Sequence, residues 1–227
     1  MRIEKIEYPA EQNNKTIREE CKKTAIDTIK KYEENGQSIG KGKTAEIFVS
    51  PRNDKFCMKA VCDKGISCNN TEIEMNFLEI LADSDIAPKP ICAIKTSQKD
   101  YLFMETIHGI SIKDLIEKDL VEDLPPKFDF KNFFETLKQQ ISLMHKKNIY
   151  HRDLHTGNIM INSDGSPVII DFGDALLQKL GEDDPYRDEN GKGELIVYPN
   201  DKNSIGENYR KMGEYLKSKG YFDKNNK

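Results

Sequence analysis

Apolar residues recur at helical spacing along much of this chain, and the recurrence predicts amphipathic helices. The predicted helices span residues 16–34, 71–82, 111–118, 129–147 and 204–219. The helix at 129–147 has the clearest apolar stripe, which indicates core packing and is formed by Phe133, Phe134, Leu137, Ile141 and Met144.

Short alternating or apolar runs between turn residues predict strands. The predicted strands are one through Ile47 and Val49, one at 56–61, a hairpin of 91–95 and 101–104, and a hairpin of 159–161 and 168–170. Residues without either pattern are expected to be a polar lead-in at 1–14 and loops at 119–126 and 181–203, the last with one short strand at 195–198.

The hairpin at 159–170 has polar residues at both of its ends. Asp153 and Asn158 precede its first strand, and Asp171 follows its second. Because a hairpin brings its two ends together, these three side chains are expected to converge. Asn158 and Asp171 supply the oxygen ligands that Mg²⁺ prefers, and Asp153 can accept a proton from a hydroxyl group. The cluster therefore predicts a phosphoryl-transfer site.

Lys59 lies in the middle of the apolar strand at 56–61. A buried ammonium group needs a partner, because an unpaired charge in an apolar layer is costly. Glu74 shares a face of the next helix with Phe77, Leu78 and Leu81 and is the first candidate for this partner. Glu72 is the alternative.

A glycine turn, Gly40-Lys41-Gly42, precedes the strand that contains Ile47. Glycines allow the backbone N–H groups to approach phosphate oxygens closely. Lys41 and Lys43 either assist phosphate binding or are only solvated.

Taken with their order in the chain, these motifs resemble the protein kinase superfamily over residues 39–173. The matching motifs are the glycine turn, Lys59, the His151-Arg152-Asp153 loop with Asn158, and Asp171-Phe172-Gly173. The resemblance implies an α+β fold of two lobes, with ATP and Mg²⁺ as cofactors. It assigns catalytic roles to Lys59, Glu74, Asp153, Asn158 and Asp171, with Asn158 and Asp171 as the metal ligands.

The same resemblance implies which residues surround the nucleotide. Met104 would line the back of the pocket, while Glu105 and Ile107 would supply main-chain contacts to the adenine. Ala45 replaces the third glycine of the family pattern, and His155 stands where many Ser/Thr kinases have a lysine. The full set of nucleotide-binding candidates is Gly40, Lys41, Gly42, Ala45, Ile47, Cys57, Lys59, Met104, Glu105, Ile107 and Met160.

The implied organisation is an N-terminal helical extension at 1–36, an N-lobe at 37–104 and a minimal, mostly helical C-lobe at 105–227. The C-lobe would be truncated, since residues 174–227 leave too little chain for the helices of a typical kinase. The sequence around the glycine turn, the catalytic loop at residues 151–158 and this truncation resemble the OspG/NleH family of bacterial type III effector Ser/Thr kinases. That likeness implies a virulence effector acting in the host cytosol and a partner such as ubiquitin or a ubiquitin-charged conjugating enzyme.

Composition narrows the alternatives. The net charge is −4 with 33% charged residues. The basic residues form no stripe along the sequence, so nucleic acid is not expected as a partner. No apolar run approaches the length of about 20 residues that a membrane span needs. The 5 cysteines have no paired metal spacing and are expected to be free thiols in a reducing cytoplasm.

Three other functions remain open from the sequence. The first is a small RIO-like or KEOPS-type kinase, and the second is an aminoglycoside-type phosphotransferase, which His155 favours. The third is a kinase-shaped scaffold that binds a partner without catalysis. No Ser or Thr occurs between Gly173 and Ser204, so control is expected from a bound partner and not from phosphoserine or phosphothreonine in that loop.

Overall fold

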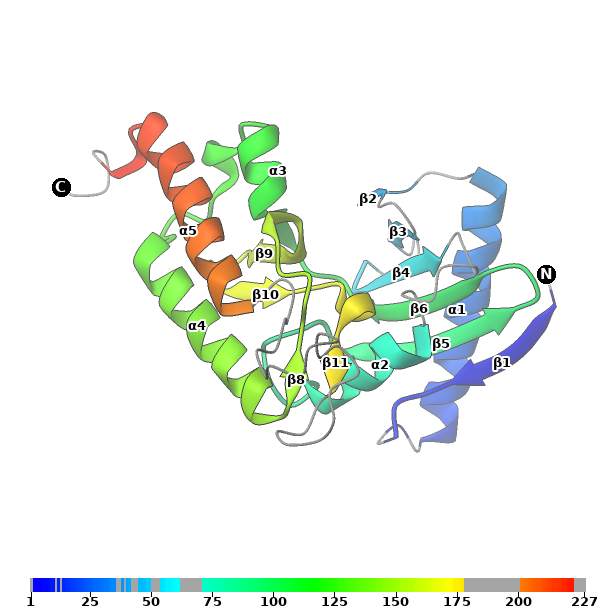
Figure 1. Cartoon of the computed structure of the whole chain (residues 1–227). Coiled ribbons are helices and arrows are strands. Elements are labelled where there is room, and N and C mark those ends of the chain that lie inside the picture. The colour runs from blue at the N-terminus through cyan, green and yellow to red at the C-terminus, as the bar shows by residue number, and fades with distance from the viewer. Residues whose placement is uncertain are drawn as a thin grey trace, which may run out of the picture. The chain divides into compact units, whose positions relative to one another are not determined.

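The computed structural model describes residues 2–10, 12, 14–35, 38, 40–41, 45–49, 54–61, 71–177 and 201–222 (Figure 1). The chain forms two compact units, Met1–Thr106 and Ile107–Lys227. The first unit includes the predicted N-terminal extension at 1–36, and it ends two residues beyond the predicted lobe boundary at 104. Among the helices described, none is both long and apolar enough to cross a membrane.

A six-stranded antiparallel sheet forms the centre of the first unit, with the strand order β1-β5-β6-β4-β3-β2. The strands are β1 (Ile3–Glu7), β2 (Gly40–Lys41), β3 (Ala45–Val49), β4 (Phe56–Val61), β5 (Pro90–Thr96) and β6 (Asp100–Glu105). The predicted strand at 56–61 and the predicted hairpin, now β5 and β6, are confirmed.

The predicted polar lead-in is wrong for Ile3–Glu7, which pairs with β5 as an edge strand. Its register shifts between Ile3 and Lys5, so its inward side chains do not follow a strict alternation. Ile3 and Ile6 nevertheless pack against the core. A strand with broken alternation carries no period-two signal, and its pairing depends on the free edge of β5.

Two helices cover opposite faces of this sheet. Helix α1 (Lys15–Asn35) packs Ala25, Ile29 and Tyr32 into a cluster with Met58 and other strand residues, so it serves as part of this unit's core. Side chains alternate along a strand, so Lys59 points away from α1. Lys59 contacts α2 (Thr71–Ile80), which therefore lies on the other face.

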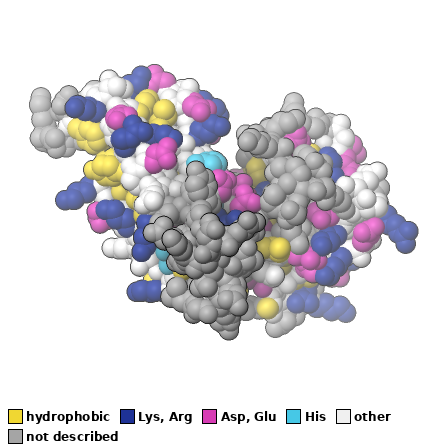
Figure 2. Space-filling model, viewed as in Figure 1, with side chains coloured by type: hydrophobic (Ala, Val, Ile, Leu, Met, Phe, Trp, Pro, Cys, Tyr) yellow, Lys and Arg dark blue, Asp and Glu magenta, His cyan; other side chains and the backbone are white. Residues whose placement is uncertain are grey.

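Where the structure describes it, the second unit is mostly helical. Its elements are β7 (Gly109–Ser111), α3 (Ile112–Glu117), η1 (Val121–Asp123), α4 (Phe130–Lys146), β8 (Ile149–Tyr150), η2 (Thr156–Asn158), β9 (Ile159–Asn162), β10 (Pro167–Ile169), η3 (Phe172–Asp174), β11 (Leu176–Leu177) and α5 (Asp201–Ser218). The strands form one sheet of order β10-β9-β7 and a β11-β8 pair. Lys, Arg, Asp and Glu side chains are interspersed over the described surface seen in Figure 2.

Local sequence signals set the boundaries of these helices. Ser111 caps α3 by accepting the Asp114 N–H at 2.9 Å. Asp129 caps α4 by accepting the N–H groups of Lys131 and Asn132. The predicted apolar stripe of α4 is buried at all its positions, Phe133, Phe134, Leu137, Ile141 and Met144.

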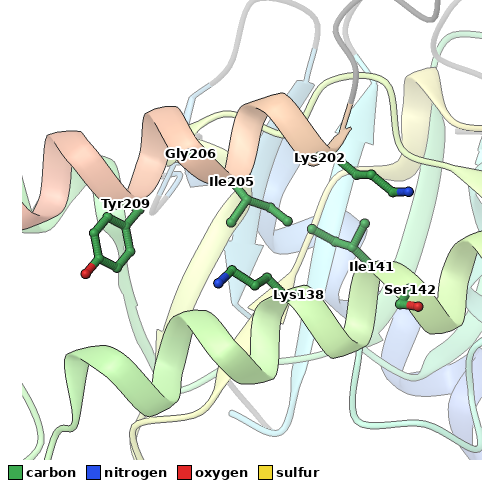
Figure 3. Close-up of a pocket in the computed structure, with 7 residues that line it drawn as sticks. All are labelled: Lys138, Ile141, Ser142, Lys202, Ile205, Gly206 and Tyr209. Carbon is green, nitrogen blue, oxygen red and sulfur yellow. The ribbon is translucent and has the colours of Figure 1, made fainter.

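Helix α5 begins earlier than predicted, because residues 201–203, expected to be loop, belong to its first turn. The predicted strand at 195–198 lies outside the described residues. Helices α4 and α5 pack side by side through Ile141 and Ile205 (Figure 3). A groove of about 510 Å³ between them is lined by Lys138, Ile141, Ser142, Lys202, Ile205, Gly206 and Tyr209.

Gly206→Ala is expected to raise the free energy of unfolding by about 0.5–1 kcal/mol, because glycine inside a helix loses more backbone entropy than alanine. A Cβ at Gly206 would meet no atom within 4 Å, so the substitution stabilises the helix without introducing steric strain. Gly213→Ala is the matched control, since its Cβ would lie 3.3 Å from Phe130 Cζ. Urea unfolding should show the larger gain for Gly206→Ala; an equal or larger gain for Gly213→Ala would contradict the packing argument.

Candidate active site

Lys59 and Glu74 form a buried ion pair in the first unit. The Lys59 Nζ lies 2.7 Å from Glu74 Oε2, and the two residues are 4% and 3% exposed. The predicted pairing is thus confirmed. Glu72, the alternative, lies near the surface and pairs with Lys95 at 2.7 Å and Lys5 at 3.2 Å.

Several predicted nucleotide-binding residues share the sheet face that carries Lys59. Ile47 lies directly opposite Lys59 on β3, and Cys57 lies directly opposite Met104 on β6. Residues opposite each other in an antiparallel pair point to the same face, as do residues two apart in one strand. Ile47, Cys57, Lys59 and Met104 therefore line one continuous surface.

The glycine turn is only partly described. Gly40 and Lys41 form β2 and pair with Ile47 and Glu46, while Ala45 is buried at the start of β3. Gly42 lies outside the described residues.

The backbone amides at the end of β6 and directly after it already donate hydrogen bonds within the first unit. The Glu105 N–H donates to the Lys89 carbonyl at 2.9 Å, and the Thr106 N–H donates to the Lys55 carbonyl at 2.8 Å. A main-chain contact from Glu105 to a ligand would therefore use its carbonyl oxygen, which also lies 3.5 Å from the Cys57 Sγ. Burial raises the pKa of Cys57 to about 12, so this thiol stays protonated and unreactive at neutral pH.

Asp153 and Asn158 are joined directly in the second unit. Asn158 is buried, and its Nδ2 donates to the Asp153 carbonyl at 2.8 Å and to Asp153 Oδ2 at 3.2 Å. The Asp153 side chain is 44% exposed, so a substrate can reach it. Because Nδ2 faces Asp153, Oδ1 of Asn158 is the atom left to bind a metal ion.

The hairpin of β9 and β10 brings Asp171 to the same region, as predicted. Its turn contains Gly165 with φ +87°, and its open end is tied by the Ile170 N–H, which donates to the Asn158 carbonyl at 3.0 Å. Met160 lies in β9 opposite Val168. Asp171 itself is exposed and has a left-handed backbone with φ 66°.

A third carboxylate, Asp174, was not singled out from the sequence. Burial raises the pKa of Asp174, and the nearby charges of Asp153 and Asp171 raise it further. Three acids within electrostatic range of one another favour a bound cation. Among the described residues no three His, Cys, Asp or Glu side chains are placed to hold a metal ion alone. Asn158 and Asp171 fit Mg²⁺ that is held mainly by nucleotide phosphates and water.

Asp201 and His151 hold the catalytic loop in place by hydrogen bonds to its backbone. Asp201 Oδ2 accepts the His151 N–H at 2.9 Å and His145 Nε2 at 3.0 Å, and Oδ1 accepts the Arg152 N–H at 2.9 Å. These bonds secure Arg152 in its left-handed conformation, with φ 69°. Burial pushes the pKa of Asp201 up, but the hydrogen bonds outweigh burial and leave that pKa below its ordinary value.

These local contacts give the loop the form of a phosphoryl-transfer site, and comparison with known proteins agrees. The protein kinase domain family matches residues 33–192, which is more than half of the 227 residues. The chain belongs to the protein kinase family. The predicted α+β kinase-like fold is thereby confirmed.

Several curated proteins resemble this chain. A probable bifunctional tRNA threonylcarbamoyladenosine biosynthesis protein from Methanococcus vannielii is 32% identical over 186 residues, which are 78% of this chain and 30% of that protein. The EKC/KEOPS complex subunit BUD32 of Yarrowia lipolytica is 34% identical over 154 residues, 61% of each chain. The serine/threonine-protein kinase PknD of Chlamydia trachomatis is 30% identical over 167 residues, 64% of this chain and 18% of PknD. The chain thus spans less than two thirds of each of these relatives.

Sequence reasoning missed Asp201, although the residue is almost completely buried at the first position of α5. An aspartate at the start of an apolar-periodic helix is a recognisable N-terminal signal. The loop prediction for 181–203 hid it, and its partners His145, His151 and Arg152 are about fifty residues away in the chain.

The free energy of unfolding should depend on pH through His151, which is fully buried. Its Nε2 donates to the Ile170 carbonyl at 3.0 Å and its Nδ1 accepts the Asp153 N–H at 3.3 Å, so the ring is neutral. Burial lowers the pKa of His151 below the unfolded value of about 6.5. The unfolded chain therefore binds an extra proton below about pH 6.5, and stability is expected to fall there by up to about 1.4 kcal/mol per pH unit.

Chemical unfolding between pH 8 and pH 5 tests this expectation by comparing the wild type with His151→Gln. The variant should lose part of the pH dependence between about pH 6.5 and pH 5. His108→Asn is the matched control, because His108 is exposed and should leave the profile unchanged. Identical profiles for all three proteins would contradict the role assigned to His151.

Proposed function

We propose that this kinase transfers the γ-phosphate of ATP to Ser or Thr hydroxyl groups of a protein substrate, with Mg²⁺ as cofactor. The observation that supports it most is the pair of bonds from Asn158 Nδ2 to Asp153, which orients a half-exposed carboxylate. PknD, a relative at 30% identity, is a serine/threonine-protein kinase by name and supports the choice of acceptor.

The proposed roles follow from the chemistry of each side chain. Lys59, aligned by Glu74, holds the α- and β-phosphates of ATP. Asp153 accepts the hydroxyl proton while the hydroxyl oxygen bonds to the γ-phosphorus and the bond from that phosphorus to the leaving ADP oxygen breaks. Asn158 and Asp171 would hold Mg²⁺, which would supply positive charge to neutralise the phosphates.

Around the nucleotide we assign the base and phosphate contacts as the family pattern implies. Ile47, Cys57 and Met104 share a face with Lys59 and would contact the adenine side of ATP. The remaining assigned positions are Gly40, Lys41, Gly42, Ala45, Glu105, Ile107 and Met160.

Control by a bound partner is part of the proposal. The sequence after Gly173 has no Ser or Thr before Ser204, so phosphoserine or phosphothreonine there cannot switch the enzyme. An effector acting in a host cytosol, stimulated by a ubiquitin-charged conjugating enzyme, is the form of control we propose from the OspG/NleH resemblance. The thiols of Cys21, Cys57 and Cys92 are free, which suits a reducing compartment.

A second candidate is a small kinase that works inside a multiprotein assembly. Two relatives favour it, one named as an EKC/KEOPS complex subunit and one as a tRNA threonylcarbamoyladenosine biosynthesis protein. For such an enzyme, a generic acceptor protein without the other members of the assembly is expected to be a poor substrate.

The test is incubation with labelled ATP and Mg²⁺ in three arms. The arms contain a generic acceptor protein, the acceptor with a ubiquitin-charged conjugating enzyme, and a panel of small hydroxyl compounds. Phosphoserine or phosphothreonine in the acceptor, increased by the charged enzyme, is the expected result. Labelling of the small compounds alone would overturn the protein-kinase proposal in favour of an aminoglycoside-type activity, and failure to bind ATP in a thermal-shift assay would leave only a scaffold.

A further inference from the structure

His155 lies between Asp153 and Asn158 in the catalytic loop, and a backbone amide defines its tautomer. The Gly157 N–H donates to His155 Nδ1 at 2.9 Å. An amide N–H can only donate, so Nδ1 carries a lone pair and the proton of the neutral ring is on Nε2. The loop therefore presents the Nε2–H group of His155, and the Nδ1–H tautomer is excluded.

The orientation of the ring is also built into the loop, although the side chain is 56% exposed. A Cβ added at Gly157 would lie 2.8 Å from His155 Cε1 and 3.0 Å from His155 Nδ1. The imidazole thus lies directly over Gly157, in the space that the Cβ of any other residue at position 157 would occupy. An exposed histidine without such a contact would be free to rotate.

The protonated nitrogen points to the proposed base. His155 Nε2 lies 3.6 Å from Asp153 Oδ2, too long for a hydrogen bond but within range of an electrostatic contact. The same oxygen accepts Asn158 Nδ2 at 3.2 Å. In the part of the chain that the structure describes, both donors face Oδ2 and none donates to Oδ1. The carboxylate is therefore held by one oxygen, and its other oxygen remains for a substrate.

We propose that His155 is a positioning residue that, together with Asn158, holds Asp153 by Oδ2 so that Oδ1 receives the proton of the acceptor hydroxyl. In that step the hydroxyl O–H bond breaks as its oxygen bonds to the γ-phosphorus, and ADP leaves with the electron pair of the cleaved P–O bond. The inference rests on the proposed kinase function and adds a second task to His155, which also caps η2.

Two substitutions separate the cap from the donor. In His155→Asn the side-chain oxygen can still accept the Gly157 N–H, since asparagine is a favoured cap, but no group replaces Nε2. In His155→Gln the amide nitrogen takes the place of Nε2, but the cap is lost. A residue that only caps would predict higher activity for His155→Asn, whereas positioning of Asp153 predicts higher activity for His155→Gln.

The expected result is that His155→Asn keeps the wild-type melting temperature and lowers kcat by about tenfold, with KM for ATP changed less than about twofold. His155→Gln should have a lower melting temperature and a kcat within about threefold of wild type. Wild-type kcat in His155→Asn, or a kcat in His155→Gln as low as in His155→Asn, overturns the proposal.

Nitrogen-15 NMR of the wild-type chain tests the inference without an activity measurement. The Nε2–H tautomer is expected, and the Asp153 side-chain carbon should shift in His155→Asn but not in His155→Gln. An Nδ1–H tautomer or an unmoved Asp153 signal overturns the proposal. If the wild type transfers no phosphate while both NMR results hold, the proposed function fails and the orientation of His155 Nε2 toward Asp153 stands.

Discussion

Asp153→Asn is expected to lower the rate of phosphate transfer by about 100-fold to 10,000-fold, the usual contribution of a general base. The substitution keeps the shape of the side chain, and its amide oxygen can still accept Asn158 Nδ2, which bonds Asp153 at 3.2 Å in the wild type. Asparagine cannot accept the hydroxyl proton at neutral pH. The loss should therefore fall on kcat, measured with labelled ATP and an acceptor protein, while ATP binding persists.

The control for this variant is Asp123→Asn. Asp123 is an exposed aspartate in η1, so the same change of charge should leave the rate within about twofold of wild type. Circular dichroism and a thermal-shift assay with ATP establish that both variants are folded and bind nucleotide. Phosphate transfer that survives in Asp153→Asn would sink the assignment of Asp153 as the base.

Lys59→Met should have a double effect, on stability and on activity. The substitution leaves the Glu74 carboxylate buried without its 2.7 Å partner. Removing one member of a buried pair costs about 3–5 kcal/mol, because the remaining desolvated charge loses the opposite charge of its ion-pair partner. ATP binding and phosphate transfer should fall as well, since the proposed phosphate contact is lost. Urea unfolding and nucleotide binding measure the two effects.

A matched pair on the same sheet and helix gives the control. Lys95 also contacts a glutamate of α2, at 2.7 Å from Glu72, but both side chains are 29% exposed. Lys95→Met should therefore cost less than about 1 kcal/mol and leave activity intact. Equal losses of stability for Lys59→Met and Lys95→Met would show that burial does not distinguish the two pairs.

The double variant Lys59→Met with Glu74→Leu separates structure from chemistry. Replacing a buried ion pair by apolar residues of similar volume is often neutral or stabilising. The free energy of unfolding should return to within about 1 kcal/mol of wild type, whereas phosphate transfer should stay abolished. Recovered activity would contradict the role proposed for Lys59.

How far the sequence predicts this protein depends on the range of each interaction. Phe133, Leu137 and Met144 recur at helical spacing, and α4 forms with that face buried. The hairpin at 159–170 has a glycine where its turn needs a positive φ, and its strands pair as expected. Strand β1 lacks a regular alternation and was missed, because only the edge of β5 makes it a strand.

The sequence alone determined the identity and order of the chemical groups, namely Lys59, Asp153, Asn158 and Asp171, since their spacing around short local elements is characteristic of the family. Tertiary structure decided which glutamate Lys59 pairs with, that Asp201 holds the catalytic loop, and which nitrogen His155 turns toward Asp153. Burial selects Glu74 over Glu72, and Asp201, at the first position of α5, bonds to His145 of α4 and to the loop at His151 and Arg152. Such choices depend on which surfaces come together in the folded chain, and no local pattern of residues records that.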